Sequence, residues 1–133
     1  MPLKAKVQLP IGYSPVVRVP LLIVLHAWAI DTAGAAASAL YHRSIAASER
    51  GWLLAAPQMT GGRTASLERQ ADIINLVDYM VSNYAVDSRR IYLLGKSMGG
   101  ANAAVIAAKY PDRFAAVVAE QGPVDLAEWY KYC

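Results

Sequence analysis

Cysteine and charged residues are scarce in this sequence of 133 residues. The single cysteine, Cys133, excludes a disulfide within the chain and gives no decisive information on its compartment. Charged residues make up only 17% of the sequence, the net charge is +3, and no run of lysines and arginines with interleaved aromatic residues is present. Because nucleic-acid binding normally requires concentrated positive charge, we expect no nucleic-acid partner.

Long apolar runs are also absent. The longest, Pro20 to Ile30, is interrupted by His26 and is shorter than the ~20 residues of a membrane-spanning helix. Lys4 and Lys6 near the N-terminus are not followed by the apolar segment of a signal peptide. We therefore predict a cytoplasmic protein that does not act at a membrane.

Hydrophobic residues, in contrast, make up 56% of the sequence, which is enough for one domain with a substantial core. Short apolar runs alternate with segments in which apolar residues recur at helical spacing. A weakly alternating strand is expected at Lys4 to Leu9. Strands buried on both faces are expected at Pro20–His26, at Trp52–Pro57, from Ile91 after a turn at Asp87-Ser88, and at Phe114–Ala119.

Helices are predicted between these strands. The first is capped by Asp31 or Thr32 and stopped by Gly51, and its apolar residues at helical spacing are Ala37, Leu40, Tyr41 and Ile45. The second is capped by Ser66, and its apolar face consists of Ile73, Leu76, Val77, Met80 and Tyr84. An alanine-rich third helix ends near Tyr110, and the segment from Leu126 to Tyr132 is compatible with a fourth.

Strands that alternate with helices indicate an α/β fold of three layers with a doubly wound, mostly parallel sheet. In such sheets ligands bind beyond the carboxyl ends of the strands. We therefore expect the functional site where four segments come together: His26-Ala27-Trp28, Pro57-Gln58-Met59, Ser97-Met98 and Glu120-Gln121-Gly122.

One of these strand ends carries a candidate nucleophile. Gly95-Lys96-Ser97-Met98-Gly99 fits the pattern G-x-S-x-G, between a short apolar strand and an alanine-rich helix. This context is typical of a nucleophile elbow. The structural alternative is a glycine-rich turn that serves only as a tight connection. A phosphate-binding P-loop is excluded, because Arg90 stands where that motif needs a glycine.

The spacing of the glycines has a steric reason. A serine on so sharp a turn holds a strained backbone conformation, and the strand and the helix on either side of it approach closely. Glycine two residues before and two residues after Ser97 removes side chains that would collide. The turn also places Ser97 at a helix N-terminus, which favours a negative charge and offers the Met98 N–H as one oxyanion donor.

With these residues the sequence resembles the α/β-hydrolase superfamily of serine hydrolases. More narrowly, it is similar to prolyl-oligopeptidase-type (S9) catalytic domains and the related esterases. The similarity extends over nearly everything from Pro20 to Tyr130. It is carried by Leu22–His26, Gly51–Pro57, Val86–Gly100 and Tyr110–Ala116.

The resemblance implies a Ser–His–acid triad with Ser97 as the nucleophile, and a second oxyanion donor from the backbone of Ala27 or Trp28. It implies a small peptide or ester substrate and neither a metal nor an organic cofactor. The acid and the catalytic histidine of the family follow later strands. Residues 1–133 are therefore expected to be the N-terminal part of a single catalytic domain, truncated after the strand that follows the elbow helix.

The chain itself offers few triad partners for Ser97. His26 matches the structural histidine of the family at the oxyanion loop, with a role as base as the alternative, and His42 is expected to be a solvated or partly packed helix residue. Asp125 is a candidate acid or, more simply, a residue of a turn or a helix cap.

Four residues near the strand ends have two interpretations each. Trp28 and Met59 either line the substrate pocket or are simply buried. Glu120 either contacts the substrate or binds an N–H group of a loop. Lys96 either neutralises an anion or is solvated.

Two further hypotheses follow from the missing catalytic histidine, the missing glycine after His26 and the missing strand beside Phe114 to Ala119. No histidine matches the catalytic base, and Ala27 replaces the usual glycine of the family, so the alternative function is a non-catalytic binding or assembly module on a hydrolase scaffold. In addition, Phe114 to Ala119 would form an apolar sheet edge. Self-association through this edge is therefore expected.

Overall fold

The computed structural model describes residues 3–60, 64–123, 125–129 and 131. The strands are β1 (Ala5–Gln8), β2 (Val19–Leu25), β3 (Leu53–Pro57), β4 (Val86–Lys96) and β5 (Ala116–Glu120). The helices are α1 (Thr32–Glu49), α2 (Leu67–Asn83), α3 (Met98–Lys109) and α4 (Leu126–Trp129), with a short 3₁₀ turn at Pro111–Arg113. The predicted starts of the first two helices are confirmed, because Asp31 caps α1 and Ser66 caps α2 through their side chains.

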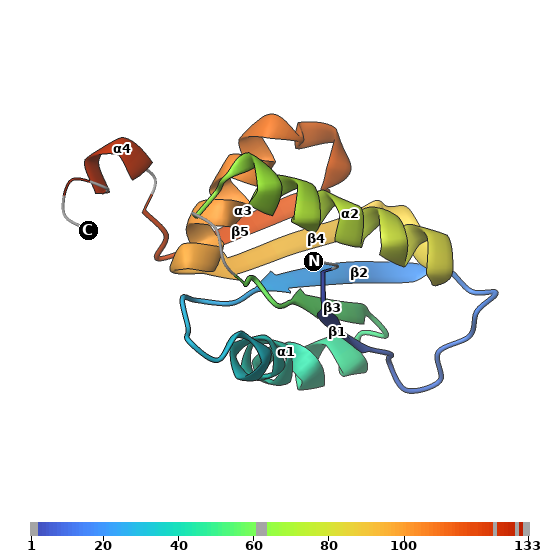
Figure 1. The fold of residues 1–133 in the computed structure, drawn as a ribbon. Helices are drawn as coiled ribbons and strands as arrows, with labels where there is room; N and C mark the ends of the chain where they lie inside the picture. The colour runs from blue at the N-terminus through green and yellow to red at the C-terminus, as the bar shows by residue number, and fades with distance from the viewer. Residues whose placement is uncertain (1–2, 61–63, 124, 130, 132–133) are drawn as a thin grey trace.

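The sheet has the strand order β1-β3-β2-β4-β5, and its pairs are parallel except for the antiparallel pair of β1 with β3. In Figure 1, α1 covers one face of the sheet, and α2 and α3 cover the other, while α4 lies apart from these layers. This arrangement confirms the predicted three-layer α/β fold. It also brings the carboxyl ends of β2, β4 and β5 to the same edge of the sheet.

The core divides between the two faces of the sheet. The larger cluster lies on the side of α2 and α3, and its largest fully buried side chains include Leu21, Ile23, Leu93 and Ile106. The smaller cluster, around Val24, Ala47 and Leu54, lies under α1. β2 and β3 are almost completely buried, as their continuous apolar sequence predicted.

The predicted apolar face of α1 is wrong in part. Tyr41 and Ile45 are 73% and 72% exposed, whereas Ala36 and Ala47 are buried. The side chain of alanine ends at Cβ, so the side of α1 that carries Ala36 and Ala47 can lie closest to β3. The close packing of this small-residue side turns the larger side chains outward.

Two predicted strands also differ from the structure. β4 begins at Val86 rather than Ile91, because the expected turn is a bulge within the strand. Asp87 holds this bulge by accepting hydrogen bonds from the Arg89 N–H and the Arg90 side chain, which lower the pKa of its carboxyl group. β5 begins at Ala116 rather than Phe114, and its side chains are exposed or half-buried rather than buried, because β5 is an edge strand.

We propose that two copies of the chain associate through β5. In the described sheet, β5 pairs only with β4, and Val118 on β5 is 49% exposed. An open apolar edge favours pairing with another chain, and a lysine on it opposes such pairing. We expect wild-type protein to form dimers or larger species in sedimentation velocity, and Val118→Lys to shift it toward the monomer. Val16→Lys, at an 87% exposed loop residue, is the control and should not. A wild-type monomer over a wide concentration range would refute the proposal.

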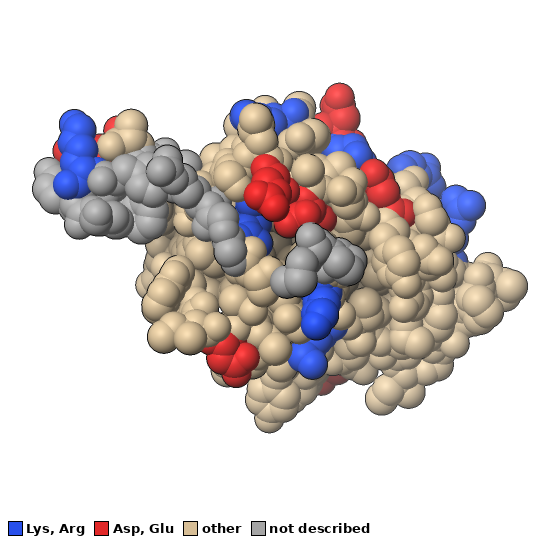
Figure 2. Space-filling model, viewed as in Figure 1, with Lys and Arg blue, Asp and Glu red and all other residues tan. Residues whose placement is uncertain are grey.

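Neither sign of charge forms a large patch on the face seen in Figure 2. There, the described lysines and arginines lie in small groups that alternate with acidic residues on a mostly uncharged surface. In the described part of the chain, no helix is both long and apolar enough to cross a membrane.

Candidate active site

Ser97 lies in the abrupt turn between β4 and α3. Its backbone has φ 55° and ψ −116°, a region that non-glycine residues rarely adopt. The Ser97 N–H donates a 2.8 Å hydrogen bond to the carbonyl oxygen of Glu120, the last residue of β5. The turn is therefore held by the neighbouring strand, and the predicted strained conformation of Ser97 is confirmed.

The glycines around Ser97 are sterically required. A Cβ atom on Gly95 would lie 2.0 Å from the Gly99 carbonyl oxygen, and one on Gly99 would lie 2.3 Å from the Leu25 carbonyl oxygen. A Cβ on Gly100 would lie 2.7 Å from the Glu120 carbonyl oxygen. These neighbours are backbone atoms, so they cannot move aside cheaply. The predicted steric role of Gly95 and Gly99 is thus confirmed.

A pocket of about 780 Å³ opens beside the serine. It is lined by Trp28, Thr64, Ser97, Met98, Gln121, Gly122 and Pro123. Trp28, Ser97, Met98, Gln121 and Gly122 belong to the strand ends where the sequence predicted the site, whereas Thr64 and Pro123 were not predicted as site residues.

Strained backbone is concentrated at this pocket. In the described part of the chain, the non-glycine residues with positive φ are Ala65, Ser97 and Gln121, with φ of 57°, 55° and 51°. Two of them line the pocket, and the third follows Thr64, which also lines it. Such residues cluster at functional sites, where the surrounding structure holds them in place.

His26 is buried, with 2% of its surface exposed, and both of its ring nitrogens have partners. Nε2 accepts a 2.9 Å hydrogen bond from the Met59 N–H, so the ring proton lies on Nδ1 and is donated to the Ala27 carbonyl oxygen at 2.5 Å. Burial lowers the pKa of His26 below 6.5, the bond to Ala27 opposes this, and the charge of Arg69 adds to it. His26 therefore connects the loops after β2 and β3 as a neutral imidazole.

The lowered pKa of His26 predicts a pH-dependent stability. The unfolded chain takes up a proton on His26 near pH 6.5, and the folded chain does so only at lower pH. Stability from this residue is therefore complete above pH 6.5 and falls as the pH decreases below it, by at most about 1.4 kcal/mol per pH unit. We expect urea unfolding to show a shallower loss between pH 6.5 and pH 5 for His26→Gln than for wild type. His42→Gln, at an exposed position, should keep the wild-type slope, and equal slopes for all three would contradict this assignment.

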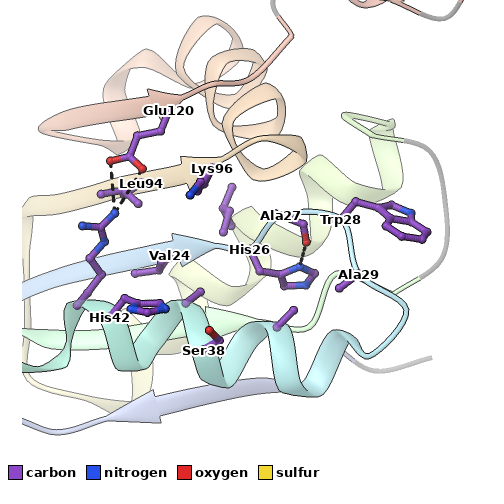
Figure 3. Close-up of a pocket in the computed structure, with 14 residues that line it drawn as sticks. Val24, His26, Ala27, Trp28, Ala29, Ser38, His42, Leu94, Lys96 and Glu120 are labelled. Carbon is purple, nitrogen blue, oxygen red and sulfur yellow. Dashed lines mark hydrogen bonds and ion pairs between the residues drawn. The ribbon is translucent and has the colours of Figure 1, made fainter. Parts of the chain in front are cut away.

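A second pocket, of about 570 Å³, lies on the α1 side of the same sheet edge (Figure 3). Its wall includes the ion pair of Arg43 on α1 with Glu120 on β5, at 3.3 Å. His42 is exposed on α1, as predicted, and Lys96 reaches this pocket from the end of β4. The carboxylate of Glu120 thus binds a side chain of α1 rather than a loop N–H, and its contact with substrate stays a prediction.

Two other candidates lie outside both pockets. Met59 is 3% exposed and belongs to the larger core cluster, so it is buried behind the site. The carboxylate of Asp125 accepts a hydrogen bond from the Glu128 N–H at 2.9 Å and so takes the role of a cap at the start of α4. Within the described ranges, no three side chains of histidine, cysteine, aspartate or glutamate could hold a metal ion together.

Fold and site together define a class of protein. A central parallel strand ends in a strained serine, glycines allow the next helix to pack closely, and a pocket opens at the carboxyl edge of the sheet. These features are those of an α/β-hydrolase scaffold. The chain belongs to the prolyl oligopeptidase family, whose model matches residues 42–132.

Several proteins that are similar to this chain are esterases. Over 50 residues the chain is 44% identical to feruloyl esterase B of Talaromyces funiculosus and 42% identical to acetylxylan esterase A of Emericella nidulans. Each match covers 38% of this chain and only 14% and 16% of these relatives. The structure of Est1E from Butyrivibrio proteoclasticus superposes with a TM-score of 0.78 at 22% identity, over 97% of this chain and 50% of that one. The chain therefore spans a minor part of its curated relatives and half of this structural neighbour.

Proposed function

We propose that the chain carries the nucleophile of a serine hydrolase that acts on a carboxylic ester or peptide bond. The observation that carries this proposal is the backbone of Ser97, which is strained, fixed by Glu120 and open to a pocket. Strain of this kind persists only where the surrounding structure maintains it. A turn that merely connects β4 to α3 would need neither the strained serine nor the pocket. Esterases among the relatives support the ester as substrate, and the family supports the peptide.

The oxyanion of the reaction would be bound by two backbone N–H groups. Met98 is the first residue of α3, so its N–H is free of helical bonds and lies at the positive end of the helix dipole. For the second donor we propose Trp28 rather than Ala27. His26 binds the Ala27 carbonyl, and in a trans peptide the following N–H points the opposite way. Trp28 also lines the Ser97 pocket, while Ala27 lines only the pocket on the α1 side.

In this proposal, the general base is a histidine that is not among these 133 residues. The sequence holds two histidines. His26 uses both ring nitrogens to connect two loops, and His42 is exposed on α1 in the other pocket. Neither is placed to accept the hydroxyl proton of Ser97.

Covalent labelling tests this proposal. A fluorophosphonate forms a stable bond to a nucleophilic serine that lies next to oxyanion donors. We expect slow labelling, with the adduct located on Ser97 by mass spectrometry and lost in Ser97→Ala. Ser44→Ala, which changes a serine on α1, is the matched control and should be labelled like wild type. Adducts on other serines, or none at all, would reject the proposal.

A non-catalytic module on the same scaffold is the second candidate function. It is favoured by one observation, the complete engagement of His26 in structural hydrogen bonds. Such a module would bind small esters or peptides in the Ser97 pocket without forming an adduct. Binding that is unchanged in Ser97→Ala, together with no labelling of wild type, would favour it.

A further inference from the structure

Two buried amide side chains from different helices hold the same residue near the Ser97 pocket. Asn102 of α3 is 1% exposed, and its Oδ1 accepts a 2.8 Å hydrogen bond from the Ala65 N–H. Gln70 of α2 is 3% exposed, and its Nε2 donates a 2.7 Å bond to the Ala65 carbonyl oxygen. Both backbone polar groups of Ala65 are therefore fixed by side chains rather than by regular secondary structure.

Ala65 is an unusual residue to hold in this way. Its φ of 57° lies in the left-handed region, which alanine adopts only at a cost. The start of α2 does not require these two hydrogen bonds to Ala65, because Ser66 already caps the helix by accepting a hydrogen bond from the Arg69 N–H. The bond from the Ala65 N–H to Asn102 holds the peptide group that joins Ala65 to Thr64, and Thr64 lines the pocket beside Ser97.

The same asparagine also contacts the elbow. Its Nδ2 donates a 2.9 Å hydrogen bond to the carbonyl oxygen of Met98, the residue after the nucleophile. One side chain therefore connects the first turn of α3 to the turn at Thr64 and Ala65. A buried polar group in an alanine-rich helix is unfavourable unless it is hydrogen-bonded, and both ends of this amide are.

We propose that Asn102, assisted by Gln70, is a positioning residue that holds Thr64 at a fixed distance from Ser97. The turn of Thr64 and Ala65 then forms a rigid wall of the pocket and limits the size of the substrate group beside the serine. Asn102 itself contacts no substrate. This inference rests on the proposed function, in which Ser97 is the nucleophile.

The test compares two fluorophosphonates, one with small alkyl groups and one with a bulky aromatic group. Wild type should react faster with the small probe. In Asn102→Ala the wall is released, so we expect the bulky-to-small rate ratio to rise by about tenfold, the scale on which a pocket discriminates substrate size. Asn83→Ala is the matched control, because Asn83 also donates to a carbonyl four residues earlier in a helix but is exposed. It should keep the wild-type ratio.

A second variant covers the case in which Asn102→Ala does not fold. Gln70→Ala removes only the bond to the Ala65 carbonyl, and it should raise the same ratio. A folded variant of either kind with the wild-type ratio would overturn the inference.

If no probe labels wild type, the proposed function fails, and hydrogen exchange then decides the inference alone. In that case the Ala65 amide should exchange at least about tenfold faster in Asn102→Ala than in Asn83→Ala, because local opening exposes it. Equal exchange would overturn the positioning role.

Discussion

Replacement of Gly99 by alanine is expected to destabilise the fold by about 3 kcal/mol or more. Gly99 lies in the first turn of α3, where alanine is otherwise the better helix former by about 1 kcal/mol. Local propensity therefore predicts stabilisation. The added Cβ, however, would lie 2.3 Å from the carbonyl oxygen of Leu25 and 2.8 Å from that of His26. Both belong to backbone at the end of the central strand β2, so relief requires α3 to move away from the sheet.

Urea unfolding measures the effect, and a second glycine separates its causes. Gly12 has a φ of 76° and no atom within 4 Å of an added Cβ. Gly12→Ala therefore carries only the cost of the left-handed conformation, about 1–2 kcal/mol. The larger loss should belong to Gly99→Ala, although its φ is ordinary. A neutral or stabilising Gly99→Ala would mean that α3 and β2 are not in close contact, and the elbow geometry would then be wrong.

The elbow was predictable because its constraints are local. Gly95, Ser97 and Gly99 are close in sequence, and the strand and helix around them follow from the short apolar run before the turn and the alanine-rich segment after it. Asp31 and Ser66 were predictable as caps for the same reason, since a cap bonds within its own first turn.

Side-chain contacts between distant segments were not predictable. Asn102 bonds Ala65, which lies 37 residues earlier, and no spacing rule identifies such a pair. The outward orientation of Tyr41 and Ile45 depends on how α1 sits on β3, which a helical repeat does not specify. Trp28 was predicted at the site, but its exposure of 71% was not, because that exposure depends on the path of the loop after β2.

Catalytic turnover of activated esters by residues 1–133 is expected to be slow. A general base contributes about 10²- to 10⁴-fold to acyl transfer, but His26 uses both ring nitrogens in structural hydrogen bonds and His42 lines the other pocket. The backbone donors and the pocket remain, and such groups alone still support catalysis about 10³- to 10⁴-fold above water in serine hydrolases that lack a triad residue. A weak rate above background is therefore the expected result with p-nitrophenyl acetate.

Two variants test which group causes this rate. Ser97→Ala should keep most of this weak rate, because the backbone donors and the pocket that support it remain in the variant. His42→Gln should leave it unchanged, because His42 lies in the pocket on the α1 side and not in the pocket of the serine. Rapid turnover that disappears in Ser97→Ala would show that a base acts within these residues. If His42→Gln also removed it, α1 would have to bring His42 to the serine, and the separation of the two pockets would not hold in solution.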